Sequence, residues 1–137
     1  EAGLRASRGP VRFDGSLSYS DPRIEGAGAS LALDGNRPPQ SPQFAAAASL
    51  TYDIEPGTLV ALSLRHVGDQ FEDDQESEVL PAFTTLGAYA QVPLAGKLDL
   101  VLRAENLFDE EIVTRVSGGD VDLGAPRTLW AGLRYGF

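Results

Sequence analysis

The sequence predicts an all-β protein, an antiparallel meander of about seven strands of roughly ten residues each. Three observations support this fold class. Apolar and polar residues alternate with a period of two along most of the chain, which places successive side chains on opposite faces of a strand. The connections alternate between short turns and long polar loops. Aromatic residues gather near the ends of the expected strands, on the apolar face.

The first three strands are expected at residues 1–8, 11–19 and 44–54. The first of them is poorly patterned. In the other two, every large apolar side chain falls on one parity, and polar or small residues hold the other. The members of this apolar parity are Val11, Phe13, Leu17, Tyr19, Phe44, Ala46, Ala48, Leu50, Tyr52 and Ile54.

Four further strands are expected at residues 59–66, 85–92, 98–105 and 128–137. The pattern of the second of these is weaker, because Tyr89 lies on its polar parity. The last strand alternates up to the final residue, Phe137. Its apolar parity holds Leu129, Ala131, Leu133, Tyr135 and Phe137.

The connections are sorted by length along the chain. Tight turns are expected at residues 9–10, 55–57 and 94–96, where Gly and Pro interrupt the pattern. The connections between them are three long polar loops. Outer-membrane β-barrels have short periplasmic turns and long extracellular loops, and strands of about ten residues can cross a bilayer at a tilt. We therefore expect a transmembrane barrel segment with extracellular loops 20–43, 67–82 and 108–127.

The aromatic residues support the same interpretation, because they form two belts on the apolar face, as expected at the two membrane interfaces. Aliphatic residues such as Leu62 and Leu100 lie between the belts. The alternative is a soluble β-protein with an aromatic-rich core. The outer belt holds Tyr19, Phe44 and Phe108, and the inner belt holds Phe13, Tyr52, Tyr135 and Phe137.

The composition excludes several other classes. The 137 residues include no Cys, so the chain has no disulfide, thiolate metal site or cysteine nucleophile. A net charge of -9 repels phosphate backbones, and no nucleic-acid partner is expected. No run approaches the roughly 20 apolar residues of a spanning helix. Because the chain lacks Met and starts abruptly at Glu1, we expect it to be part of a longer protein.

His66 is the only histidine, and the nearby Ser63 and Asp69 suggest a hydrolase. The strand parity argues against this hypothesis. His66 shares a face with Leu62 and Leu64, whereas Ser63 points to the other face, and a nucleophile must lie within hydrogen-bond reach of its base. We expect no enzyme activity.

The acidic run at residues 72–78 raises the possibility of a calcium site, because Ca²⁺ binds six to eight oxygen ligands. Asp73 and Asp74 are the foremost candidate ligands. The spacing does not follow an EF-hand, and no Gly stands at the required turn position. A solvated loop is therefore the preferred interpretation, and no cofactor is expected. The acidic residues of this run are Glu72, Asp73, Asp74, Glu76 and Glu78.

Several segments resemble the C-terminal part of the barrel of TonB-dependent outer-membrane receptors. Residues 105–111 (ENLFDEE) are similar to the family's NLFD segment before the last extracellular loop, and residues 124–127 (GAPR) to the G-x-P-R that opens the final strand. Residues 133–137 (LRYGF) are similar to the C-terminal pattern of outer-membrane proteins. Weaker similarities occur at residues 35–42, 67–74 and 80–83. The motif residues are Asn106, Leu107, Phe108, Asp109, Pro126 and Arg127.

The resemblance implies that residues 1–137 are an open segment of a barrel of about 22 strands with a plugged lumen. The plug domain and the segment that engages TonB would then lie upstream of this chain. The function implied is active uptake of a scarce solute across a Gram-negative outer membrane. A ferric siderophore is the first expectation, and cobalamin or an oligosaccharide remain open. A passive porin-type barrel and a soluble all-β binding module are the alternatives.

The resemblance also implies roles and partners. The partners are outer-membrane lipid, the rest of the barrel, the plug, TonB, and the barrel assembly machinery, which would read Tyr135 and Phe137 through strand pairing. From their residue types, Asn106 and Asp109 are expected to shape the last loop, and Arg127 to anchor it. Charged side chains of the polar parity are expected to pair with each other or to contact the plug. These are Arg65, Asp99, Arg103, Glu105 and Arg134.

Overall fold

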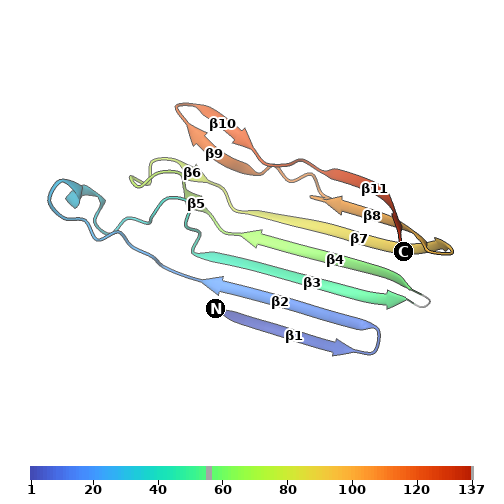
Figure 1. Cartoon of the computed structure of the whole chain (residues 1–137). Coiled ribbons are helices and arrows are strands. Elements are labelled where there is room, and N and C mark those ends of the chain that lie inside the picture. Colours follow the sequence, from blue (N-terminus) through green and yellow to red (C-terminus); the bar gives the residue numbers. More distant parts are fainter. Residues whose placement is uncertain (55–56, 137) are drawn as a thin grey trace.

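The computed structural model describes residues 1–54 and 57–136, and it is all-β, with 59% of residues in strands and 4% in helix. Seven of the described strands form one antiparallel sheet in chain order (Figure 1). The fold class predicted from the alternation is therefore confirmed. The sheet strands are β1 (Ala2–Arg8), β2 (Val11–Tyr19), β3 (Phe44–Ile54), β4 (Thr58–Val67), β7 (Phe83–Ala95), β8 (Leu98–Glu105) and β11 (Thr128–Tyr135).

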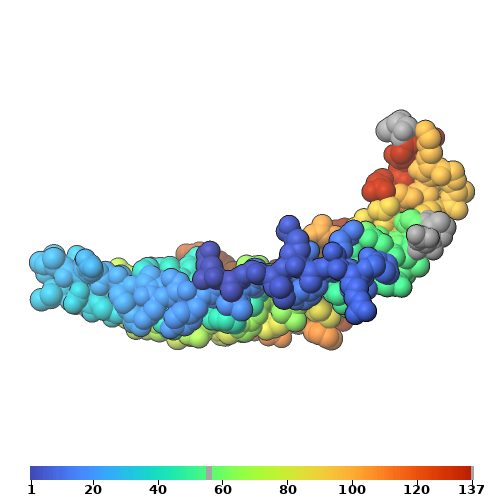
Figure 2. Space-filling view, turned by 90° about the horizontal axis from the view of Figure 1, so that it is seen from below, coloured from blue at the N-terminus to red at the C-terminus, as the bar shows by residue number. Residues whose placement is uncertain are grey.

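The sheet is open and curved, as expected for a barrel segment (Figure 2). Each strand pairs with the one before it, and β1 and β11 form the two edges of the described sheet. The pairing preserves the two faces, because Phe13 lies opposite Leu50 and Leu50 lies opposite Leu62. The apolar parity of every strand thus falls on one face, and the polar parity on the other.

This single layer has almost no core. Among the described residues, Val67 and Leu80 are the only buried hydrophobic residues. Large apolar side chains stand exposed across one face, with Leu62 at 49% and Leu133 at 67% of their maximal accessible surface. Contiguous apolar surface of this extent marks a face that another apolar environment covers.

The strand ends differ in places from the sequence-based expectation. Strands β4 and β7 extend beyond the expected residues 59–66 and 85–92, because backbone pairing continues where the side-chain alternation fades. The expected turn at 94–96 is wrong. Leu94 and Ala95 belong to β7, which shifts register between Pro93 and Ala95, and the turn follows at residues 96–97. Pro93 lacks an N–H, so it is accommodated at this bulge. In the expected turn at 55–57, Glu55 and Pro56 lie outside the described residues.

The long connections are more ordered than expected. The first contains the 3₁₀ helix η1 (Gly28–Leu33). The second contains the small sheet of β5 (Gln70–Phe71) and β6 (Val79–Leu80), and the third the hairpin of β9 (Val113–Ser117) and β10 (Asp120–Leu123). In the segment 80–83, which resembles a strand start of the receptor family, Leu80 ends β6 and β7 begins at Phe83. The loop ends also move, since Val67 belongs to β4 and β8 ends at Glu105.

Figure 1 shows these long connections at one end of the sheet and the tight turns at the other end. The described residues include no helix with the length and hydropathy needed to span a membrane.

Candidate functional site: the outer loops and the polar face

The three long loops carry most of the negative charge of the chain. They hold 14 of the 20 acidic residues but only 4 of the 11 basic ones. Each of these four arginines lies within 4.0 Å of a carboxylate, so the loop end of the sheet has a strong negative excess. The pairs are Arg23–Asp21 (2.7 Å), Arg37–Asp69 (3.3 Å), Arg115–Asp122 (3.5 Å) and Arg127–Asp109 (4.0 Å).

Arg37 joins the first long loop to the second. Its side chain is only 12% exposed, and its Nη2 lies 3.3 Å from Asp69 Oδ2. The guanidinium carbon lies 4.4 Å from the centre of the Phe71 ring, a cation–π geometry. The backbone N–H of Arg37 also donates to Glu76 Oε1 at 2.7 Å. One residue therefore makes three separate contacts with the neighbouring loop.

Glu72 is the point where all three long loops meet. Its Oε2 accepts a hydrogen bond from Gln40 Nε2 of the first loop at 3.1 Å. Its Oε1 lies 4.0 Å from Arg115 Nε of the third loop, and the Glu72 side chain is 17% exposed. The backbone N–H of Gln40 adds a bond to the Phe71 carbonyl at 2.7 Å. The sequence analysis did not detect this junction, because its members are far apart in the chain.

Asp73 organises the tip of the second loop. Its carboxylate accepts bonds from the Ser77 hydroxyl (2.6 Å) and from the backbone N–H groups of Gln75, Ser77 and Glu78. These donors hold the pKa of Asp73 below its ordinary value, the Ser77 hydroxyl contributing most. In the same way, Gln43 and then Arg23 lower the pKa of Asp21.

The suggested calcium site gains no support from this geometry. The Asp73 carboxylate is engaged by its own loop, and Asp74 contributes its backbone carbonyl to Asn36 Nδ2 at 2.9 Å. No group of three or more acidic or histidine side chains within the described residues is arranged to hold a metal ion.

Asn106 closes the base of the third loop. It is only 5% exposed and adopts a left-handed backbone conformation with φ of 49°. Its Nδ2 donates to the carbonyls of Glu110 (2.8 Å) and Ala125 (3.2 Å), and its Oδ1 accepts the Glu110 N–H at 2.9 Å. Asp109 Oδ1 accepts the backbone N–H of Arg127 at 2.8 Å. Asn106 thus bonds nearby backbone, as expected from its residue type, and Asn106 and Asp109 also join the start of the loop to its end.

The other motif residues lie at the same place. Leu107 donates its backbone N–H to the Leu86 carbonyl at 2.8 Å, and Phe108 is 77% exposed beyond the end of β8. Pro126 and Arg127 bring the chain back to β11. The motif that is similar to the receptor family is therefore a connected unit around the start and the end of one loop.

Most of the charged side chains on the polar face pair with one another. Arg134 Nη2 lies 2.8 Å from Asp99 Oδ2, which also accepts a bond from Gln91 Nε2 at 3.1 Å. Arg103 forms an ion pair with Glu105. Arg65 has no carboxylate partner among the described residues, and its guanidinium lies 5.6 Å from the centre of the Phe83 ring.

The residues of the hydrolase hypothesis do not meet. His66 Nδ1 lies 2.8 Å from Thr84 Oγ1, and its ring packs against Phe44 with centroids 5.7 Å apart. Ser63 lies opposite Ser49 and Gly87 on the polar face, and Asp69 pairs with Arg37. The predicted placement of His66 and Ser63 on opposite faces of the sheet is confirmed.

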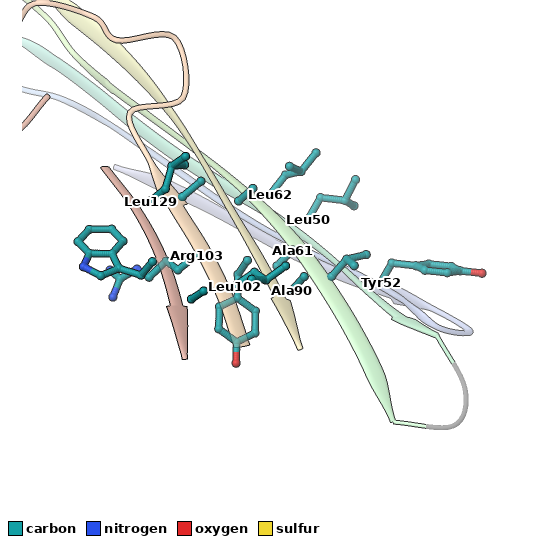
Figure 3. Close-up of a pocket in the computed structure, with 14 residues that line it drawn as sticks. Leu50, Tyr52, Ala61, Leu62, Ala90, Leu102, Arg103 and Leu129 are labelled. Carbon is teal, nitrogen blue, oxygen red and sulfur yellow. The ribbon is translucent and has the colours of Figure 1, made fainter. Parts of the chain in front are cut away.

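The apolar face contains a hollow of about 760 Å³ above strands β3, β4, β7, β8 and β11. Leu50, Leu62 and Leu129 project to the same side of the sheet, and Arg103 extends away from them (Figure 3). Alanines form much of the lining between the leucines. The hollow is an open groove in the apolar face and has no convergent polar groups for chemistry. Its alanines are Ala61, Ala88, Ala90, Ala104 and Ala131.

Comparisons of sequence find no relatives, since neither a protein-family model nor a curated protein matches the chain. Comparisons of structure find proteins with a similar fold. The siderophore receptor PiuA from Acinetobacter baumannii has a TM-score of 0.83 and 18% identity, over 97% of this chain and 20% of that chain. The ferric citrate transporter FecA has a TM-score of 0.77 and 21% identity, over 89% and 20%. BauA, the ferric preacinetobactin receptor from A. baumannii, has a TM-score of 0.76 and 20% identity, over 97% and 21%.

The chain spans about a fifth of the length of these structures. At such low identity, the similarity establishes the fold. The seven-stranded sheet matches a partial barrel of TonB-dependent receptors in its fold. Of the three similar structures, two are named as receptors and one as a transporter.

Proposed function

We propose that this chain is the C-terminal part of the barrel of a TonB-dependent outer-membrane receptor that imports an iron chelate. The observation that carries the proposal is the match to the siderophore receptor PiuA, with a TM-score of 0.83 over 97% of the chain. The motif around Asn106 supports the same assignment, because it occurs where the family has its last extracellular loop. A ferric siderophore is the substrate that the similar structures favour over cobalamin or an oligosaccharide.

The orientation follows from the two ends of the sheet. The connections 20–43, 67–82 and 108–127 lie on the extracellular side, and the tight turns lie on the periplasmic side. The exposed apolar face contacts lipid of the Gram-negative outer membrane. The polar face lines the lumen, where charged side chains are tolerated because they face water or protein.

The partners follow from the same assignment. The rest of the barrel pairs with the edge strands β1 and β11, and a plug domain outside this chain fills the lumen. TonB acts on the plug and energises import. The barrel assembly machinery recognises the last strand through Tyr135, which is 61% exposed on the apolar face, and through Phe137, which lies outside the described residues.

The first test is the size of the native gene product. An antibody against residues 67–82 is used to detect it in the outer-membrane fraction of the source cells, and its intact mass is measured. A product several times larger than 14.5 kDa is expected for a full receptor. A product of 14.5 kDa contradicts the proposal.

The second test is import. Cells with and without the gene are compared for uptake of ⁵⁵Fe presented as citrate, catecholate and hydroxamate chelates. We expect deletion of the gene to abolish uptake of one chelate class and to leave the others unchanged. Removal of TonB should also abolish uptake of that class. Uptake that depends on the gene but not on TonB would instead identify a passive porin.

A further inference from the structure

The negative excess of the chain belongs to its loops and not to its sheet. The loops 20–43, 67–82 and 108–127 hold 14 acidic and 4 basic residues, a net charge of -10. The rest of the chain holds 6 acidic and 7 basic residues, a net charge of +1. Figure 1 shows the three loops at the same end of the sheet. The charge is therefore concentrated on one end surface, and the sheet below it is nearly neutral.

The basic residues of the loops do not present positive charge to a solute. Each of the four loop arginines lies within 4.0 Å of a loop carboxylate. Five acidic residues of the loops are exposed, and their carboxylates make no ion pair or hydrogen bond with any residue that the structure describes. The unpaired charge of this surface is thus of one sign. The five free carboxylates come from all three loops and belong to Glu25, Glu78, Glu110, Glu111 and Asp120.

Contacts between the loops join their charges into one surface. The second loop has six acidic residues and no basic one. Its Glu72 bonds Gln40 of the first loop at 3.1 Å and lies 4.0 Å from Arg115 of the third. Its Glu76 accepts the backbone N–H of Arg37 at 2.7 Å. Charges of one sign on adjoining loops add to a field that changes the association rate of a charged ligand by a factor of about 10–10³.

We propose that this end surface selects iron chelates by charge, and that the chelate imported is a cation. The inference rests on the proposed function, which places the loops on the extracellular side, where a chelate first meets the receptor. Three hydroxamate groups neutralise Fe³⁺, so that a trihydroxamate with a free amine is a cation at neutral pH. Citrate and catecholate chelates of Fe³⁺ are anions, which this surface repels. The substrate class is therefore a hydroxamate chelate that carries an ammonium group.

The test compares three probes that share one iron centre and differ in charge. Ferrioxamine B, a ferric trihydroxamate with a free amine, is a cation. Acetylation of its amine gives a neutral probe, and succinylation gives an anion. Initial uptake of ⁵⁵Fe at limiting probe concentration is measured in cells with the full receptor and in cells without the gene. At low ionic strength we expect the cation to enter about tenfold faster than the anion, and this ratio should shrink in high salt, which screens exposed charges.

Neutralising the five free carboxylates should weaken this preference. The change halves the negative excess of the loops, so that the ratio should fall from about tenfold to about threefold. A matched control exchanges Glu for Asp and Asp for Glu at the same five positions and should retain the preference, because it conserves the charge. The neutralising substitutions are Glu25→Gln, Glu78→Gln, Glu110→Gln, Glu111→Gln and Asp120→Asn.

Equal uptake of the three probes overturns the inference, and so does uptake confined to a citrate or catecholate chelate. Import that depends on TonB stands in both cases. A preference that survives neutralisation, or that is lost equally in the charge-conserving control, also overturns the inference. If no chelate is imported, binding of the three probes to the purified receptor decides. Tighter binding of the cation then retains the charge selection and disproves only import, whereas equal binding disproves both.

Discussion

The side chain of Asn106 pairs with the backbone of Glu110 through two hydrogen bonds. Nδ2 donates to the Glu110 carbonyl at 2.8 Å, and Oδ1 accepts the Glu110 N–H at 2.9 Å. The amide thus pairs with the backbone just beyond the end of β8, as a neighbouring strand would. Its second donation, to the Ala125 carbonyl at 3.2 Å, ties the end of the loop to its start. A loop of some twenty residues is thereby closed at its base by one buried side chain.

Replacing Asn106 should open the base of this loop. Asn106→Ala leaves three backbone groups without their partner, at a cost of about 1–3 kcal/mol. It also places Ala at a φ of 49°, which Asn tolerates better. Asn106→Gly removes the bonds but suits this φ, so we expect it to be less destabilising than Asn106→Ala. Hydrogen exchange at the Glu110 amide of the purified receptor measures the effect, with Asp120→Ala as the control. Unchanged exchange in both Asn106 variants would contradict the assigned role.

Because Arg37 links the first two long loops, its replacement should make both loops more accessible to protease. Arg37→Lys keeps the charge beside Asp69 but loses the planar group that lies over Phe71, a contact of about 0.5–2 kcal/mol. We therefore expect faster proteolysis within both 20–43 and 67–82, and a larger effect in Arg37→Ala. Limited proteolysis of intact cells with mass spectrometry identifies the cut sites. Arg23→Ala is the control, because Arg23 is 46% exposed and pairs within its own loop. Cleavage that increases in the first loop alone would argue against the junction.

The tip of the second loop should lose order in acid. The pKa of Asp73 lies below the ordinary Asp value of about 3.9, because Ser77 and three backbone N–H groups bind its charged form. A lowered folded-state pKa contributes stability that is complete above the unfolded-state value and is lost as the pH falls through the folded-state value. Protection of the Ser77 and Glu78 amides should therefore decrease below about pH 4. Hydrogen exchange corrected for intrinsic rates measures this change. Asp73→Asn should abolish the pH dependence, and Asp74→Asn should leave it intact.

Gly87 and Ser63 should be energetically coupled. A Cβ at Gly87 would lie 2.7 Å from Ser63 Oγ and 3.3 Å from the Ala104 carbonyl oxygen. We expect Gly87→Ala to destabilise the barrel and Ser63→Gly to restore part of the loss, with a coupling of about 0.5–3 kcal/mol. Heat-dependent gel migration of the folded receptor measures the unfolding midpoint. Gly132→Ala is the matched control on the same face, because no atom lies within 4 Å of its added Cβ. Strictly additive effects would show that the Ser63 hydroxyl is not the obstacle.

The sequence by itself determined the strands and their faces. Residues 11–19 and 44–54 were predicted as strands and form β2 and β3 with the same bounds. This was possible because alternation is a local property, so that the parity of a side chain within one strand fixes its face. The role of Asn106 could likewise be anticipated from residue type, since its side chain bonds the backbone of Glu110, four residues away.

Only the tertiary structure decided what the long loops and the polar face contain. Arg37 meets Asp69 and Phe71 across more than thirty residues, and Trp130 meets Arg103 through strand register. The turn after β7 was misplaced because pairing with β8 carried the strand through Pro93. Such contacts depend on which strands lie side by side and in which register, and a pattern within one segment carries no information about its distant partner. Local alternation therefore gave the two faces of the sheet, and long-range pairing decided which side chains meet on them.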